Sequence, residues 1–285
     1  MKKTFLVVLI IVVQSLLLVG CSSNEDIDTT ATMDSYIVLD EEPPESLNTF
    51  TPRKKDKNEQ PRESTSPIPT PVSQEKIIVI DPGHAATRTT DYEPVGPGAQ
   101  EKKMASVIGT RGVSTGIYEF ERVLEISKLI RDELQNRGYE VIMTKESNEE
   151  VLSNIQRAQI ANSAHADAFL RIHADASEDA GDSGAMAMCI TPNNPYIPSL
   201  YSSSRFLAET VLSAYCASTG FTNRGIEETD SMTGNNWSEV PCILLELGYM
   251  TNSSDDLQLA SPAIQQAIAR GVADGLDNYF RGLHQ

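Results

Sequence analysis

The chain has 285 residues and carries 23 lysines and arginines against 40 aspartates and glutamates, which gives a formal net charge of −17. A chain this acidic lacks the excess of basic residues that binds nucleic acid, so we expect no nucleic-acid partner. Acidity favours solubility but does not select a substrate.

The first twenty residues have the layout of a secretory signal peptide. Lys2 and Lys3 precede an apolar run, residues 5–19, that is too short for a comfortable membrane span. The run ends in LVGC (18–21), which resembles the bacterial lipobox. We therefore expect cleavage before Cys21, a lipid on that cysteine, and an extracytoplasmic protein anchored to the cell membrane. An uncleaved anchor in which the cysteine is incidental is the alternative.

The next segment, residues 21–75, changes composition abruptly. It contains an acidic part (DEEPPES), a charged part (PRKKDKNEQPRES) and a part rich in proline, serine and threonine (TSPIPTPVS). Such composition buries too little apolar surface to offset the entropy of the chain. We interpret it as a disordered tether, stiffened by proline, between the lipid and a catalytic domain at 76–285.

Within residues 76–285, short apolar runs alternate with helical patterns. We expect strands at 76–81, 139–145, 168–173, 184–191 and 241–247, and helices at 119–138, 149–164, 198–218 and 262–280. Near-continuous apolar strands separated by helices predict a single α/β domain with a largely parallel central sheet flanked by helices.

Residues 85–118 do not follow this alternation. They are rich in glycine, proline, threonine and serine and show no clear period. A loop of this length inside a compact domain is usually functional or disordered.

The three cysteines after Cys21 do not have the spacing of a metal-binding motif. We expect buried free thiols at Cys189 and Cys242.

Four chemically active side chains fall where the carboxyl ends of the predicted strands meet. His84 and His173 follow two strands, Glu246 interrupts an apolar strand, and Glu119 opens the first helix. Sites in open parallel sheets gather at this edge. Two histidines and a carboxylate form a common catalytic zinc set, and a second carboxylate can accept a proton from water. Spacing alone indicates a metallohydrolase, and each residue also has a purely structural interpretation.

Two further histidines are weaker candidates. His165 lies near a helix C-terminus and we interpret it as structural, while His284 is in the tail.

Four motifs that follow one another along the chain indicate a more specific function. IVIDPGH, the helix start at Glu119, ADAFLRIHADAS and VPCILLELGYMTN together resemble the zinc-dependent N-acetylmuramoyl-L-alanine amidases of the Amidase_3 family. The resemblance implies that His84, Glu119 and His173 bind one Zn²⁺, that Glu246 is catalytic, and that the substrate is peptidoglycan. The bond expected to break joins N-acetylmuramic acid to the L-alanine of the stem peptide.

The chain departs from the family pattern in two places. Val123 stands where members commonly have asparagine, and TGNNWSEVP precedes the last strand where Leu-Arg is common. Trp237 in that segment is either part of a substrate-contacting rim or a packing residue. Glu121, two residues from Glu119, is the alternative ligand at the helix start, but it points to a different side of the helix.

Two other functions remain open at the level of sequence. One is a zinc peptidase that cuts within the stem peptide, and the other is a wall-binding lipoprotein with a catalytically silent domain. The loop at 85–118 could also cover the site until a protein activator moves it.

Overall fold

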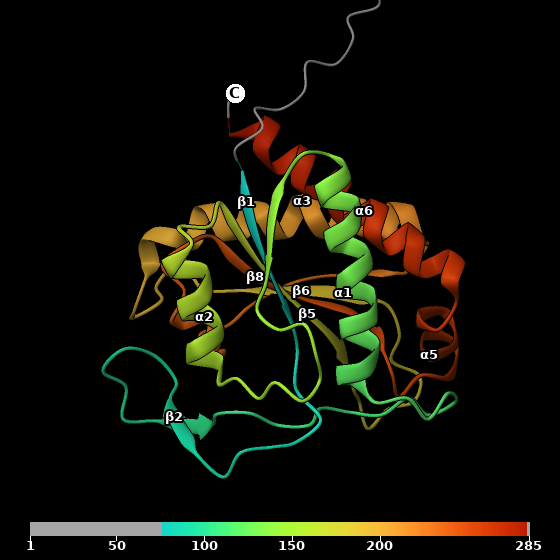
Figure 1. The fold of residues 1–285 in the computed structure, drawn as a ribbon, viewed down its shortest axis with the longest axis horizontal. Helices are drawn as coiled ribbons and strands as arrows, with labels where there is room; N and C mark the ends of the chain where they lie inside the picture. Colours follow the sequence, from blue (N-terminus) through green and yellow to red (C-terminus); the bar gives the residue numbers. More distant parts are fainter. Residues whose placement is uncertain (1–75, 284–285) are drawn as a thin grey trace, which may run out of the picture. The chain divides into compact units, whose positions relative to one another are not determined.

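The computed structural model describes residues 76–283, which form a six-stranded sheet in the order β4-β1-β5-β8-β6-β7 with helices on both faces (Figure 1). The strands of this sheet are β1 (Ile77–Pro82), β4 (Glu140–Met143), β5 (Ala168–Asp175), β6 (Ala185–Cys189), β7 (Asn223–Glu228) and β8 (Cys242–Tyr249). The longer helices are α1 (Glu119–Asn136), α2 (Asn154–Ser163), α3 (Tyr201–Thr219) and α6 (Pro262–Gly282). The shorter ones are η1 (Pro198–Leu200), α4 (Thr233–Asn236) and α5 (Ser253–Leu259).

The predicted signal peptide, Cys21, the tether and His284 lie outside the described residues, so those expectations stay predictions. None of the helices within 76–283 is long and apolar enough to cross a membrane.

The expected fold class is confirmed. Strands β4, β1, β5 and β8 are parallel, whereas β6 pairs antiparallel with β8 and carries β7 parallel to itself at the edge. All five predicted strands are present. The sequence analysis missed β7 because its residues, NRGIEE, are mostly exposed and polar, with only Ile226 packing against the core.

The two faces of the sheet have different cores, set by the alternation of side chains along each strand. In β5, Leu170 and Ile172 point into the large core beneath α1, α3 and α6. Phe169 points to the opposite face, into a smaller core beneath α2. Arg171 and His173 follow Phe169 on that second face, so the strand turns polar there as it approaches its carboxyl end.

Helix α1 forms as its sequence predicts and lies against the large core. Val123, Ile126, Ile130 and Leu134 are fully buried on one face, and each contributes about 1.5–3 kcal/mol relative to exposure. The helix ends in a Schellman motif, in which left-handed Gly138 (φ 92°) donates to the Gln135 carbonyl.

Helix α2 is shorter than predicted. It begins at Asn154 rather than at 149, because Ser153 and Gln156 form a capping box that fixes the first turn there. The S-x-x-Q spacing was a readable signal for this boundary.

The long loop at 85–118 contains structure that the sequence analysis did not predict. Strands β2 (Tyr92–Pro94) and β3 (Lys102–Met104) form an antiparallel hairpin. Figure 1 shows β2 beyond the end of the domain where β1 finishes and α1 begins.

Several contacts fasten this hairpin to the domain. The carboxylate of buried Glu93 accepts hydrogen bonds from the backbone N–H groups of Asn154 and Ile155, at 2.9 and 3.2 Å. On the other side, the indole N–H of Trp237 donates to the Pro94 carbonyl at 3.0 Å. Trp237 also packs against the smaller core, which favours the packing interpretation over a substrate-contacting rim. These hydrogen bonds hold the hairpin in place against the rest of the domain.

Candidate active site

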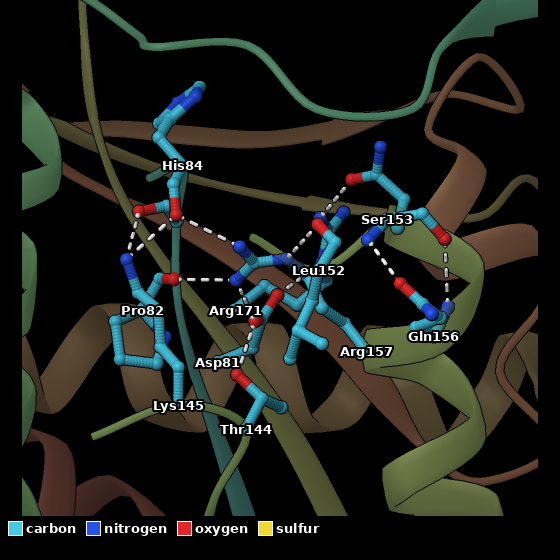
Figure 2. A network of polar contacts seen from close by, with 12 residues as sticks. Asp81, Pro82, His84, Thr144, Lys145, Leu152, Ser153, Gln156, Arg157 and Arg171 are labelled. Carbon is cyan, nitrogen blue, oxygen red and sulfur yellow. Dashed lines mark hydrogen bonds and ion pairs between the residues drawn. The ribbon is translucent and has the colours of Figure 1, made fainter. Parts of the chain in front are cut away.

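The turn after β1 presents His84 in an uncommon backbone conformation. Its φ is 61°, in the left-handed region, which costs a non-glycine residue energy and is found most often at functional sites. Two cations hold the turn by binding the His84 carbonyl: Lys145 Nζ at 2.7 Å and Arg157 Nη2 at 2.9 Å (Figure 2). The Pro82 carbonyl accepts a further bond from Arg157 Nη1 at 2.7 Å.

These contacts belong to a buried charge network around Asp81. One carboxylate oxygen lies 2.6 Å from Arg157 Nη1 and the other 3.1 Å from Arg171 Nε (Figure 2). Thr144 donates a third bond at 2.7 Å. Burial raises the pKa of Asp81, but the two guanidinium groups outweigh it and hold that pKa well below its usual range. The carboxylate is therefore ionised and fixes both arginines beneath the turn.

Beyond this network, three donor atoms from separate elements converge. Glu119 Oε1 lies 3.0 Å from His84 Nε2 and 3.1 Å from His173 Nδ1, and the two imidazole nitrogens lie 3.1 Å apart. Ligands bound tetrahedrally to one zinc ion are about 3.3 Å apart, given metal–ligand distances of about 2 Å. The donor triangle thus has the size and the atom types of a zinc site.

Hydrogen bonds outside the triangle orient its donors. His84 Nδ1 lies 3.0 Å from the Val107 carbonyl, which can only accept a hydrogen bond, so Nδ1–H donates to it and Nε2 presents its lone pair inward. The Glu119 carboxylate accepts from the backbone N–H groups of Thr110, at 3.0 Å, and Ala174, at 3.1 Å.

The electrostatics of the triangle also suit a cation. Burial raises the pKa of Glu119, but the neighbouring His173 and His84 side chains outweigh it and hold the pKa well below its usual range. Burial lowers the pKa of His173 to about 4. An ionised carboxylate and a neutral imidazole are the protonation states that metal binding requires.

Two glycines make room for this packing. A Cβ at Gly83 would lie 2.4–2.7 Å from the His173 ring. At Gly109, where φ is 84°, a Cβ would meet Glu119 Oε2 at 2.5 Å. Both positions exclude larger side chains because the backbone lies directly against the donor triangle.

Glu246 lies beside the triangle on β8, where it is the register partner of His173 on β5. It is 8% exposed, and its Oε2 has no hydrogen-bond partner among the described residues. Burial, followed by the charges of Glu119 and Asp175, raises the pKa of Glu246 well above its usual range. A buried carboxylate without a partner is costly to ionise, and groups with such perturbed pKa values are common at functional sites.

The structure brings together the four predicted site residues and separates the alternatives from them. Glu121 does not face the triangle, because its carboxylate accepts from the Tyr118 backbone N–H at 2.9 Å and caps the helix. His165 is exposed, with φ 48°, just beyond the end of α2, in agreement with a structural role. Cys189 and Cys242 are buried free thiols, as predicted.

Sequence reasoning missed several residues around the four. A cavity of about 440 Å³ contains the donor triangle and Glu246, and other side chains complete its lining. Polar members of this lining are Lys103, Asn154, Arg171, Asp175 and Thr233. Arg171 could have been found, because it lies two residues before His173 on a strand and so shares its face.

Comparison with known proteins identifies the family. The family model described as N-acetylmuramoyl-L-alanine amidase, Amidase_3, matches residues 78–278. The chain belongs to this family. Family membership and fold together make the domain a peptidoglycan amidase, and they agree with the activity expected from the sequence motifs.

Individual relatives are more distant. The chain is 31% identical over 170 residues to the uncharacterized protein YqiI of Bacillus subtilis, covering 59% of this chain and 77% of YqiI. It is 28% identical over 208 residues to the N-acetylmuramoyl-L-alanine amidase LytC of the same species, covering 72% of this chain but only 36% of LytC. The crystal structure of the N-acetylmuramyl-L-alanine amidase Ami1 from Mycobacterium smegmatis has the same fold. It matches with a TM-score of 0.66 and 23% identity, covering 73% of this chain and 97% of Ami1.

Proposed function

We propose that this chain is a zinc-dependent N-acetylmuramoyl-L-alanine amidase that hydrolyses the amide bond between N-acetylmuramic acid and the L-alanine of the stem peptide. One observation carries the proposal: three donor atoms of a zinc-type set lie about 3 Å from one another beside an unpaired, buried carboxylate. All four residues line one cavity in a domain of the amidase family.

His84, Glu119 and His173 would hold the metal. Zinc bound there would supply a Lewis acid that polarises the amide carbonyl and lowers the pKa of bound water to about 7. The residues fit this group because two imidazoles and one carboxylate offer one donor atom each. All three residues also line the cavity.

Glu246 would act as the general base and then as the general acid. It would take a proton from the attacking water and return it to the departing amine of L-alanine. The raised pKa of Glu246 suits this exchange, since a carboxylate of ordinary pKa holds a proton too weakly to deliver it near neutral pH. Within residues 76–283, Oε2 has no hydrogen-bond partner, which would leave that atom free for water or the amine.

The proposal includes the location of the enzyme. Cleavage before Cys21 and lipidation of that residue would anchor the chain to the outer surface of the cell membrane. The segment at 22–75 would then carry the domain toward the wall. The amidase family supports extracytoplasmic action on peptidoglycan.

Mass spectrometry of a purified disaccharide–tripeptide after incubation with the zinc-loaded chain tests the reaction. Amidase action yields a disaccharide with a free lactyl carboxylate and a tripeptide with N-terminal alanine. A product that keeps alanine on the sugar would instead identify a stem-peptide peptidase. Binding without any cleavage would identify a catalytically silent domain.

A further inference from the structure

The cavity extends past the donor triangle to a second group of polar side chains. Arg171, His173 and Asp175 occupy successive same-face positions of β5, and all three line the cavity. Along this side of the cavity, the cation of Arg171, the proposed metal ligand His173 and the anion of Asp175 therefore follow one another. The mechanism above uses His173 and leaves Arg171 without a role in chemistry.

Arg171 has more hydrogen-bond donors than the protein satisfies. Its guanidinium carries five N–H groups. Nε donates to Asp81 at 3.1 Å, Nη2 to Asn154 Oδ1 at 2.8 Å, and Nη1 makes only a long contact, 3.4 Å, with Asn235 Oδ1. At least two N–H groups have no acceptor among the described residues, although Arg171 is only 3% exposed.

Direct ion pairing neutralises the positive charge of Arg171 only in part, although Glu246 and Asp175 line the same cavity. Asp81 is its ion-pair partner, and that single carboxylate is shared with Arg157. Asn154 and Asn235 are neutral. A buried guanidinium in this state favours an anion that reaches it through the cavity.

Two further residues support a binding role for this end of the cavity. Thr233, 4% exposed, also lines the cavity, and its hydroxyl has no hydrogen-bond partner among residues 76–283. Lys103 of the hairpin adds a second cation to the lining, steered inward by its bond to the Ser231 carbonyl at 2.7 Å.

The backbone of α4 fixes the position of the guanidinium. A Cβ at Gly234 would lie 2.5 Å from Arg171 Cζ, so the helix lies directly against the guanidinium. Together with Asp81 and Asn154, this contact limits Arg171 to one orientation. Preorganised donors of this kind are typical of binding subsites.

We propose that Arg171 and Lys103, with Asn154 and Thr233, form a subsite that binds the carboxylate of the second stem-peptide residue while the scissile amide lies at the donor triangle. This inference rests on the proposed amidase function and adds the substrate group that the enzyme selects.

The spacing of Arg171 and His173 along β5 points to the residue of the stem peptide. Arg171 and His173 are two residues apart on a strand, so their Cα atoms are about 7 Å apart. An extended peptide advances about 3.5 Å per residue. From the nitrogen of L-alanine, the first carboxyl group within that reach is the α-carboxyl of the γ-linked glutamate that follows. In some cell walls this group is free, and in others it is a carboxamide.

Two synthetic substrates that differ only at this group test the proposal. One is N-acetylmuramoyl-L-alanyl-γ-D-glutamyl-L-lysine with a free α-carboxyl, and the other is its α-carboxamide. We expect the zinc-loaded chain to prefer the free acid by about 10- to 100-fold in kcat/KM, mainly through KM. This is the range for losing hydrogen bonds between charged groups.

Variants then assign the preference to residues. Lys103→Gln and Arg171→Gln should each reduce the preference about tenfold by raising KM for the free acid, with little change for the carboxamide. Lys102→Gln is the matched control, because Lys102 is the exposed neighbour on β3 and does not line the cavity. Should Arg171→Gln fail to fold, Lys103→Gln and the wild-type preference still decide the question.

Calorimetric binding of the two compounds to zinc-loaded Glu246→Gln protein separates this inference from the proposed function. Tighter binding of the free acid supports the subsite even where no turnover is seen, whereas absent turnover of both substrates by wild type contradicts only the amidase function. Equal kcat/KM and equal binding for the two compounds would overturn the subsite. A preference that Lys103→Gln and Arg171→Gln leave unchanged would overturn it as well.

Discussion

His173 and Glu246 lie side by side as register partners on the adjacent parallel strands β5 and β8. One residue belongs to the donor triangle and the other is the unpaired carboxylate, so the pairing of two central strands sets their spacing. A site built on paired strands is more rigid than one built on loops. This relationship underlies the proposed division of roles between metal binding and proton transfer.

Glu246→Gln should abolish turnover without affecting the metal. We expect kcat to fall by about 10²- to 10⁴-fold, the usual contribution of a general base, with zinc content unchanged by elemental analysis. Glu239→Gln, at an exposed position just before β8, is the matched control and should keep full activity. Normal turnover in Glu246→Gln would remove the residue from the mechanism.

His173→Ala should lose both zinc and activity. Loss of an outer-shell partner alone costs about 10- to 100-fold in metal affinity, so loss of a ligand should cost at least about 100-fold. Competition with a fluorescent chelator measures this affinity. His165→Asn is the control, because His165 is exposed and asparagine tolerates the left-handed conformation found there. Unchanged zinc affinity in His173→Ala would contradict the ligand assignment.

Gly83→Ala should displace the His173 ring and weaken metal binding. The added methyl would lie 2.4–2.7 Å from the imidazole, and overpacking of this kind costs about 1–3 kcal/mol of unfolding free energy. Gly181→Ala is the control, since its nearest neighbour is the Asp179 side chain at 3.1 Å on an exposed loop. Urea unfolding and zinc titration of both variants provide the test, and wild-type values for Gly83→Ala would refute the packing argument.

Asp81→Asn should destabilise the domain by about 3–5 kcal/mol, because it leaves two buried guanidinium groups without their shared carboxylate. Asp132→Asn breaks an exposed ion pair with Arg131 and should cost less than about 1 kcal/mol. Urea unfolding at neutral pH measures both values. Similar losses in the two variants would contradict the importance of the buried network.

The same network predicts a pH dependence. The pKa of Asp81 is lower in the folded protein than in the unfolded chain, where it is about 3.9. Ionised Asp81 therefore stabilises the fold above pH 4, and this stabilisation is lost as the pH falls toward the folded-state pKa. The difference in unfolding free energy between wild type and Asp81→Asn should shrink below about pH 4. A difference that stays constant from pH 7 to pH 3 would contradict the assigned ionisation.

Periodicity predicted the elements that carry the large core, because long apolar runs dominate them. Helix α1 and strands β1, β5 and β8 were found in this way. The edge strand β7 and the hairpin were not predicted, because their strands are short and polar and are stabilised by tertiary contacts. The bonds from Glu93 to the start of α2 join segments that lie 61 and 62 residues apart in sequence.

Among the candidate site residues, motif and strand position predicted His84, His173 and Glu246, which the structure brings into one cavity. Glu119 and Glu121 were distinguished in the sequence only by helix geometry and family resemblance. The structure adds the physical reason, because the Glu121 side chain is used as a helix cap. The second half of the cavity was not predicted, since Lys103 and Thr233 reach it from the unpredicted hairpin and a one-turn helix.

Reconstitution of the chelator-treated chain with zinc tests the central claim most directly. New N-terminal alanine released from purified peptidoglycan is measured as zinc is added back. We predict no release without metal, release that rises to a plateau at one zinc per chain, and no release from Glu246→Gln at any zinc level. Full release of alanine from metal-free protein, or from the Glu246→Gln variant, would contradict the account.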